Sequence, residues 1–231
     1  MIPPISIDGT DITGATIDGT DVTEITVDGQ TVFTAGPPII VDDFESGNLN
    51  IWEGDTGSSN IVSTSKVGSF AVQLGINDSI GTQTGIDKIV ETDDTFSIWA
   101  KMSSSSTRAV IQYNADSPSP SFGPDGYSIR LFTNSDTLTL AKRVNGSFIG
   151  LDTVSVNYSD QWYRVEGKHQ SNGDINVELY DENGNIVASV SANDTELLTN
   201  GTFDGNYSKI ADGGLPGGGA ITPIFDHWII L

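Results

Sequence analysis

The sequence predicts an all-β protein in which a small N-terminal segment of β-hairpin repeats precedes an antiparallel β-sandwich. From residue 39 onward, apolar and polar residues alternate over short segments, which is the period of a strand with one buried face. Asn-Gly pairs and other turn residues separate these segments at the spacing of a sandwich or barrel. The 26 glycines and 9 prolines also fit a globular β protein better than a disordered one.

A ten-residue repeat occupies the first 36 residues. The triplets Ile7–Gly9, Ile17–Gly19 and Val27–Gly29 each precede a short run of β-prone residues. Their Asp-Gly pairs favour two-residue hairpin turns, in which both central residues need a positive φ. Three such units contain too few large apolar residues to form a core alone. We therefore interpret residues 1–36 as an attachment or assembly segment whose apolar side chains are buried only in the assembled state.

Gly36-Pro37-Pro38 ends the repeat region, because proline cannot donate to a β ladder. We place the domain boundary there and predict that residues 37–231 form the sandwich. The segment Phe96–Met102 illustrates its pattern, since alternation turns Ile98 inward and Trp99 to the opposite face.

The net charge of −21 arises from 31 acidic and 10 basic residues. One interpretation is a halophilic protein, whose self-repulsion is screened by concentrated salt. The other is an ordinary acidic, soluble protein; we favour the first because lysine is also scarce. The charge argues against nucleic-acid binding, which needs a basic surface, and against docking on anionic lipid.

Cysteine is absent from the sequence, so disulfides and thiolate metal sites are excluded. No apolar run is long enough to span a bilayer, and we predict no membrane insertion. No recognisable secretion signal follows Met1. We expect the protein to reach the outside of a cell by another route, such as assembly into a virus particle.

Five segments together carry a resemblance to a known fold: Asp42–Glu45 (DDFE), Phe96–Met102 (FSIWAKM), Trp162–Gly167 (WYRVEG), Ile175–Val190 (INVELYDENGNIVASV) and Phe225–Trp228 (FDHW). Their order resembles the concanavalin A-like lectin/glucanase jelly roll, as in laminin-G-type domains, over about residues 39–231. The resemblance implies an antiparallel jelly-roll sandwich. The N-terminal repeats resemble short β segments in structural proteins of tailed viruses. With the acidic composition, this suggests a virus of haloarchaea.

A structural calcium site is the first candidate for chemistry. Asp43 and Glu45 lie on the opening strand, and Asp226 lies on the closing strand. In an antiparallel jelly roll the terminal strands often pair, which would bring these carboxylates together as oxygen ligands. Many domains that resemble this fold carry such an ion. The alternative is that these acids are surface residues or turn caps.

A glycan-binding face is the second candidate. Five side chains fall on the polar side of alternating strands and could share one concave face: Trp99, Gln112, Arg130, Arg164 and Glu166. An aromatic ring stacked on a sugar, with charged groups bonding its hydroxyls, would bind a glycan. The alternative is that a loop covers Trp99 and the charged groups are solvated.

Glycoside hydrolysis is the third candidate, and the sequence argues against it. Glucanases of this fold place acids on alternate positions of one strand, so that two carboxylates flank the scissile bond. The nearest match is Glu178 with Asp181 and Glu182, but the last two are adjacent and precede a turn. No nucleophile elbow is present. We predict that the protein is not an enzyme.

The sequence therefore favours a virion structural protein, such as a capsid turret, a decoration or a tail fibre. Its N-terminal repeats would join it to other virion proteins and to copies of itself, because open strand edges invite pairing between subunits. The jelly roll would be displayed on the extracellular particle and contact host-surface glycans. The alternative is a carbohydrate-binding module of a cell-surface or secreted protein.

Overall fold

The computed structural model divides the chain into two compact units, Met1–Pro38 and Ile39–Leu231. In the first unit it describes the backbone of six short strands, and side chains are described from residue 38 onward. The described ranges of the second unit are 39–82, 90–103, 107–117, 125–205, 207–212 and 222–231. Every regular element in these ranges is a β-strand. They contain no helix that could cross a membrane.

The first unit contains three antiparallel strand pairs, each of which brackets one Asp-Gly dipeptide of the repeat. The pairs are β1 (Ser6–Ile7) with β2 (Thr10–Asp11), β3 (Thr16–Ile17) with β4 (Thr20–Asp21), and β5 (Glu24–Val27) with β6 (Gln30–Thr34). Each pair forms its own two-stranded sheet.

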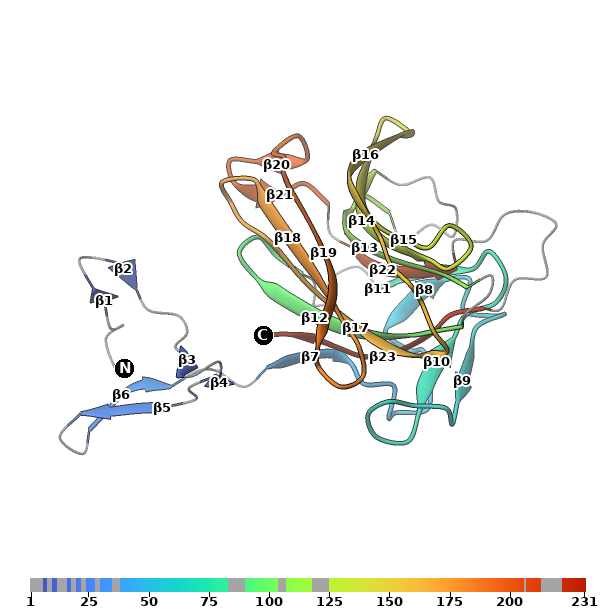
Figure 1. Ribbon diagram of the computed structural model, residues 1–231, viewed down its shortest axis with the longest axis horizontal. Coiled ribbons are helices and arrows are strands. Elements are labelled where there is room, and N and C mark those ends of the chain that lie inside the picture. The colour runs from blue at the N-terminus through green and yellow to red at the C-terminus, as the bar shows by residue number, and fades with distance from the viewer. Residues whose placement is uncertain are drawn as a thin grey trace. The chain divides into compact units, whose positions relative to one another are not determined.

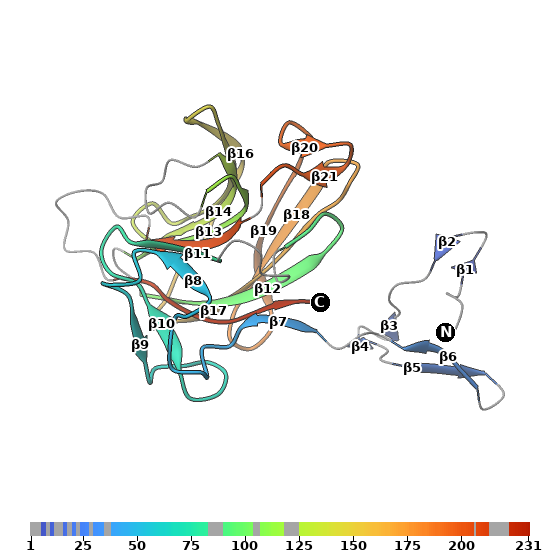
Figure 2. The same cartoon turned by 180° about the vertical axis from the view of Figure 1, so that it is seen from behind.

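The second unit is a sandwich of two antiparallel sheets, which Figures 1 and 2 show as separate layers. The first sheet has the order β19-β18-β17-β12-β23-β10-β9, and β7 also pairs with β23. Its strands are β7 (Ile39–Asp42), β9 (Asn60–Val62), β10 (Ala71–Gln73), β12 (Thr95–Met102), β17 (Gln161–His169), β18 (Asp174–Tyr180), β19 (Ile186–Asn193) and β23 (Ile224–Ile230). The first and last strands of this unit therefore pair, as the sequence predicts.

The second sheet has the order β16-β15-β14-β13-β22-β11-β8. Its strands are β8 (Trp52–Gly54), β11 (Ser79–Thr82), β13 (Arg108–Ala115), β14 (Gly126–Phe132), β15 (Thr137–Val144), β16 (Ser147–Ser155) and β22 (Tyr207–Asp212). A small separate hairpin is formed by β20 (Leu198–Thr199) and β21 (Thr202–Phe203).

The hydrophobic core lies between the two sheets. In β12, Phe96 and Ile98 are buried while Trp99 on the opposite face is partly exposed, which confirms the alternation predicted for this strand. In β14, Ile129 and Leu131 face the core from the second sheet. Each large apolar side chain buried in this way contributes about 1.5–3 kcal/mol to stability relative to an exposed one. The prediction of an all-β antiparallel sandwich is confirmed.

The opening segment is fixed to the core by Asp42. Its Oδ1 atom accepts a hydrogen bond from the Phe44 amide at 2.7 Å, and its Oδ2 atom accepts one from the Trp52 indole at 2.6 Å. Phe44 has a φ of 59° and stacks on Trp52 at 5.9 Å between ring centroids. The buried Asp42 thus shapes the turn that follows β7.

Candidate functional site

The five predicted glycan-binding residues do not share one face. Trp99 lies on β12, and Arg164 and Glu166 lie on β17, all on the outer face of the first sheet. Gln112 on β13 and Arg130 on β14 lie on the outer face of the second sheet. The core separates the two sheets, so the two groups point in opposite directions. The prediction of a single face for all five was wrong.

A cluster on the first sheet, which we call the Trp99 platform, contains Trp99, Arg164, Glu166, Glu178 and Tyr180. Strand register places Trp99 opposite Arg164 and Arg164 opposite Tyr180, so the three residues form one row across β12, β17 and β18. Glu166 and Glu178 are opposite each other in the next row with the same facing. Two aromatic rings and three charged groups therefore lie together on one surface.

Arg164 connects the members of this platform. Its Nη1 atom lies 2.8 Å from Glu166 Oε2, and the side chains of this ion pair are 29% and 25% exposed. The Arg164 guanidinium also stacks on the Tyr180 ring, at 4.2 Å from the ring centroid. These contacts fix the positions of the donor and acceptor groups, because a planar guanidinium can stack and hydrogen-bond at the same time.

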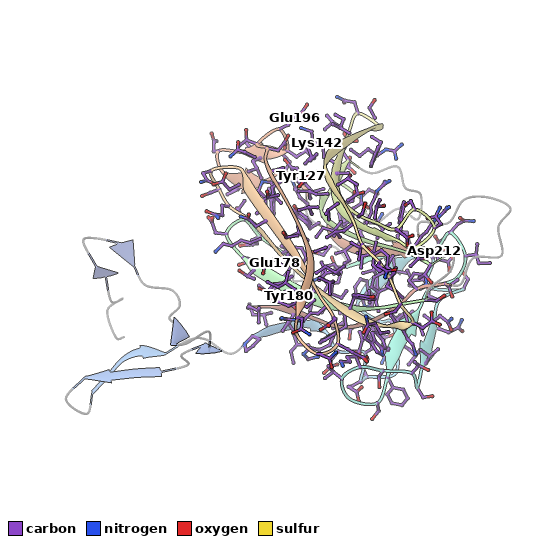
Figure 3. All side chains as sticks on the ribbon, in the orientation of Figure 1. Tyr127, Lys142, Glu178, Tyr180, Glu196 and Asp212 are labelled. Atoms are coloured by element: carbon purple, nitrogen blue, oxygen red, sulfur yellow. The ribbon has the colours of Figure 1, made fainter. Side chains whose placement is uncertain are left out.

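Tyr180 donates a hydrogen bond from its hydroxyl to Glu178 Oε2 at 2.5 Å, and Figure 3 labels both side chains. Burial and this hydrogen bond raise the pKa of Tyr180 to about 12. The phenol therefore remains protonated at neutral pH and continues to donate, while Glu178 remains available as an acceptor.

Trp99 has a cation over its ring. Lys66 Nζ lies 4.8 Å from the ring centroid. The segment that carries Lys66 is held by Asp226, whose Oδ2 atom accepts hydrogen bonds from the amides of Lys66 and Val67 at 2.6 and 2.8 Å. Asp226 lies opposite Trp99 in the β12–β23 register. A loop therefore places a lysine over Trp99, in part as the alternative interpretation held, while the indole stays partly exposed.

The predicted calcium ligands bind backbone amides. Glu45 Oε1 accepts hydrogen bonds from the amides of Ser69 and Phe70 at 2.7 and 2.8 Å. Asp43 Oδ1 accepts one from the Glu45 amide at 3.1 Å, and Asp226 binds the loop described above. Burial raises the pKa of Asp226.

Within the described residues, no three His, Cys, Asp or Glu side chains converge where they could hold a metal ion. The arrangement therefore does not fit a site built from Asp43, Glu45 and Asp226, because each carboxylate already faces N–H donors. Calcium binding itself stays a prediction.

The acids of the nearest hydrolase-like pattern are also engaged. Asp181 accepts hydrogen bonds from the amides of Asn183 and Asn185, both at 2.9 Å, and so shapes the turn after β18. The side chain and backbone of Asn185 lower the pKa of Asp181. Glu182 is exposed beside it, while Glu178 belongs to the Trp99 platform.

Three residues of this surface were missed by the sequence analysis: Lys66, Glu178 as a platform member, and Tyr180. The two β18 residues could have been found, because alternation puts Glu178 and Tyr180 on the face opposite Leu179. Lys66 lies in a loop, and no local pattern indicates that it reaches Trp99.

Neither a protein-family model nor a curated protein sequence matches this chain. Solved structures do match it. A protein of unknown function from Shewanella oneidensis MR-1 is 15% identical, with a TM-score of 0.53, over 84% of this chain and 83% of its own. A β-glucanase from Bacillus licheniformis is 10% identical, with a TM-score of 0.50, over 84% and 97%. Winged bean acidic lectin, complexed with methyl-α-D-galactose, is 11% identical, with a TM-score of 0.50, over 77% and 93%.

The Ile39–Leu231 unit has the lectin/glucanase jelly-roll fold. This confirms the fold that the sequence resemblance implied. At such low identities the likeness concerns the fold alone, and the function of the jelly-roll domain has to be argued from its own residues.

Proposed function

We propose that the jelly-roll domain is a carbohydrate-binding module and that the Trp99 platform binds the sugar. The observation that carries this proposal is one row of the sheet in which two partly exposed rings, Trp99 and Tyr180, flank Arg164, which is ion-paired with Glu166 in the next row. A sugar ring presents an apolar C–H face and a rim of hydroxyls. Aromatic faces and fixed polar groups are the surfaces that complement these two parts.

The spacing of the platform suits an extended glycan. Trp99 and Tyr180 are separated by one intervening strand, so their backbones lie about 10 Å apart. Each ring can therefore contact a different sugar unit of one chain. Arg164, which can only donate, and the two glutamates, which can only accept, lie between and beside the rings to orient hydroxyl groups.

Two of the structures that share the fold are named as a lectin bound to a galactoside and as a β-glucanase. Their names support a carbohydrate ligand for this chain. We propose binding without hydrolysis, because Asp181 and Glu182 lie at a turn and Glu178 is bonded to Tyr180.

The proposal is tested by screening the full chain on an array of neutral glycans and measuring the dissociation constant of each hit by calorimetry. Trp99→Ala should weaken binding at least tenfold, which corresponds to about 1.4 kcal/mol. Phe70→Ala is the matched control, since it removes a partly exposed aromatic ring outside the platform. Equal binding by Trp99→Ala and the unchanged protein would contradict the proposal, as would the absence of any glycan ligand.

The Met1–Pro38 unit supports a second function, which is assembly into a larger particle. The observation in its favour is the succession of separate two-stranded hairpins, whose unpaired edges can bind strands of other subunits. In this role the protein would be a virion component, such as a capsid turret, a decoration or a tail fibre, and would present the jelly-roll domain to host glycans. Multivalent display would strengthen weak binding at each domain.

Light scattering of the protein with and without residues 1–36 tests this second function. We expect the full chain to form an oligomer and the shortened chain to be a monomer. A monomer in both cases would rule out assembly through the repeats.

A further inference from the structure

Three of the chain's four arginines lie on the outer face of the second sheet, on the side away from the Trp99 platform. They alternate there with two phenylalanines. The series runs across β13, β14, β15 and β16, and we call it the arginine–phenylalanine ladder: Arg108, Phe132, Arg130, Phe148 and Arg143.

The first four members of the ladder contact one another in turn. The Phe132 ring centroid lies 5.7 Å from Arg108 Cζ and 5.8 Å from Arg130 Cζ. Arg130 Cζ also lies 4.1 Å from the Phe148 ring centroid. Arg143 is directly opposite Phe148 in the β15–β16 register. Cations and aromatic faces therefore form one continuous surface.

Arg130 is the informative member of the ladder. Among the residues that the structure describes, it forms no hydrogen bond and no ion pair, and its buried Nε atom has no acceptor. Burial and the nearby Arg143 lower its pKa to about 10, so it is still charged at neutral pH. In a chain with 31 acidic residues, the fold keeps this cation beside another cation. An anionic group bound here would supply the missing acceptor and relieve the repulsion.

Phe148 adds an accessible apolar face beside this charge. It is 49% exposed and lies on the edge strand β16, with Arg130 against its ring. Gly150 lies two residues further along β16 on the same face, and apart from its own chain neighbours no atom lies within 4 Å of the position that a Cβ would take there. A flat ring next to an unneutralised guanidinium complements a sugar that carries an acidic group, because the ring stacks on the C–H face while the guanidinium binds the anion.

We propose that the arginine–phenylalanine ladder binds an anionic polysaccharide, with a carboxylate or sulfate held by Arg130 and Arg143 and a sugar ring stacked on Phe148. A nucleic acid also combines anions with rings that stack on aromatic side chains. A nucleic acid bound through its backbone phosphates needs a broad basic surface, whereas the ladder offers three arginines in a chain of net charge −21. The ladder does not depend on the Trp99 platform, which lies on the opposite side of the sandwich.

Calorimetry of the full chain with four polymers tests the ladder. Polygalacturonate supplies carboxylates and dextran sulfate supplies sulfates. Fully methyl-esterified polygalacturonate has the same sugar chain as polygalacturonate without its charge, and poly(dT) supplies phosphates. We expect binding to at least one of the two acidic polysaccharides, with the esterified polymer and poly(dT) binding at least tenfold more weakly.

Arg130→Gln and Phe148→Ala should each weaken binding of the acidic polysaccharide at least tenfold. Lys168→Gln is the matched control for the lost charge, because Lys168 lies on β17 of the other sheet, and it should bind like the unchanged protein. Melting curves of the three variants verify that each is folded; Phe148→Ala removes only a half-exposed ring.

Three results would overturn the proposal: no acidic polysaccharide binds, poly(dT) binds more tightly than both, or Lys168→Gln weakens binding as much as Arg130→Gln. A protein that binds neutral glycans but no acidic polysaccharide would overturn the ladder and leave the Trp99 platform standing.

Discussion

At the scale of single residues, Asp194 joins both sheets at one end of the sandwich. Its carboxylate accepts hydrogen bonds from the Tyr127 hydroxyl at 2.6 Å and from Lys142, both on the second sheet. Its backbone oxygen lies 3.0 Å from Nε2 of His169, on the first sheet. Burial would raise the pKa of Asp194, but the hydrogen bonds from Lys142 and Tyr127 outweigh it and lower that pKa. Figure 3 shows Tyr127, Lys142 and Glu196 together at this end.

His169 should make the stability of the domain depend on pH. Burial lowers its pKa below 6.5, although Asp194 and Asp93 oppose this shift. Because the unfolded chain then binds more protons than the folded one, stability should fall as the pH drops through about 6.5. The lowered pKa of Asp194 affects the stability of the domain only at lower pH, below its ordinary value of 3.8.

Urea unfolding between about pH 8 and about pH 5 measures this dependence. The His169→Gln variant should lose most of the decrease over this range. If the variant shows the full decrease in stability, groups other than His169 cause the pH dependence.

At the scale of elements, two carboxylates anchor the loop between β9 and β10. Glu45 binds the amides of Ser69 and Phe70, and Asp226 binds those of Lys66 and Val67. Hydrogen bonds from backbone amides to a carboxylate are stronger than those to neutral acceptors. The loop is therefore held by residues at the first and last strands of the jelly-roll domain, since Glu45 follows β7 and Asp226 lies on β23.

Removing one anchor should loosen this loop. In Glu45→Ala, the amides of Ser69 and Phe70 should exchange with deuterium about tenfold faster or more, because they lose their acceptor. Hydrogen exchange measured by mass spectrometry reports this change, and Glu182→Ala, at an exposed turn, is the matched control. Unchanged exchange in Glu45→Ala would show that the anchor does not hold the loop.

The prediction of a calcium site at Asp43, Glu45 and Asp226 can be tested with a chelator. An ion held by Asp43, Glu45 and Asp226 would make the melting temperature fall when EDTA is added. A melting temperature that EDTA leaves unchanged would mean that Glu45 and Asp226 bind only the amides of the loop, and Asp43 only the Glu45 amide.

At the scale of the whole molecule, the net charge of −21 is the dominant long-range feature. Raising sodium chloride from about 0.1 M to about 1 M shortens the screening length from about 10 Å to about 3 Å. Because like charges then repel less, the melting temperature should rise over this range. Calorimetry across the salt series measures it. A melting temperature that falls with salt would contradict the halophilic interpretation.

The local structure and the facing of side chains follow from the amino-acid sequence alone. Period-two alternation placed Ile98 in the core and Trp99 outside, because successive residues of a strand point to opposite faces. The pairing of the first and last strands of the jelly-roll domain followed from the resemblance to a known fold. Alternation along β18 also predicts that Tyr180 faces outward, opposite to Leu179.

Which outward-facing residues become neighbours depends on how the strands pair across the whole fold. Alternation says that Trp99, Arg130 and Arg164 all face outward, but it does not say on which sheet. That depends on pairing between strands far apart in the sequence, such as β12 with β17, and no local pattern specifies a partner strand or its register. Long-range pairing therefore put Trp99 beside Arg164 on one side of the sandwich and Arg130 on the other.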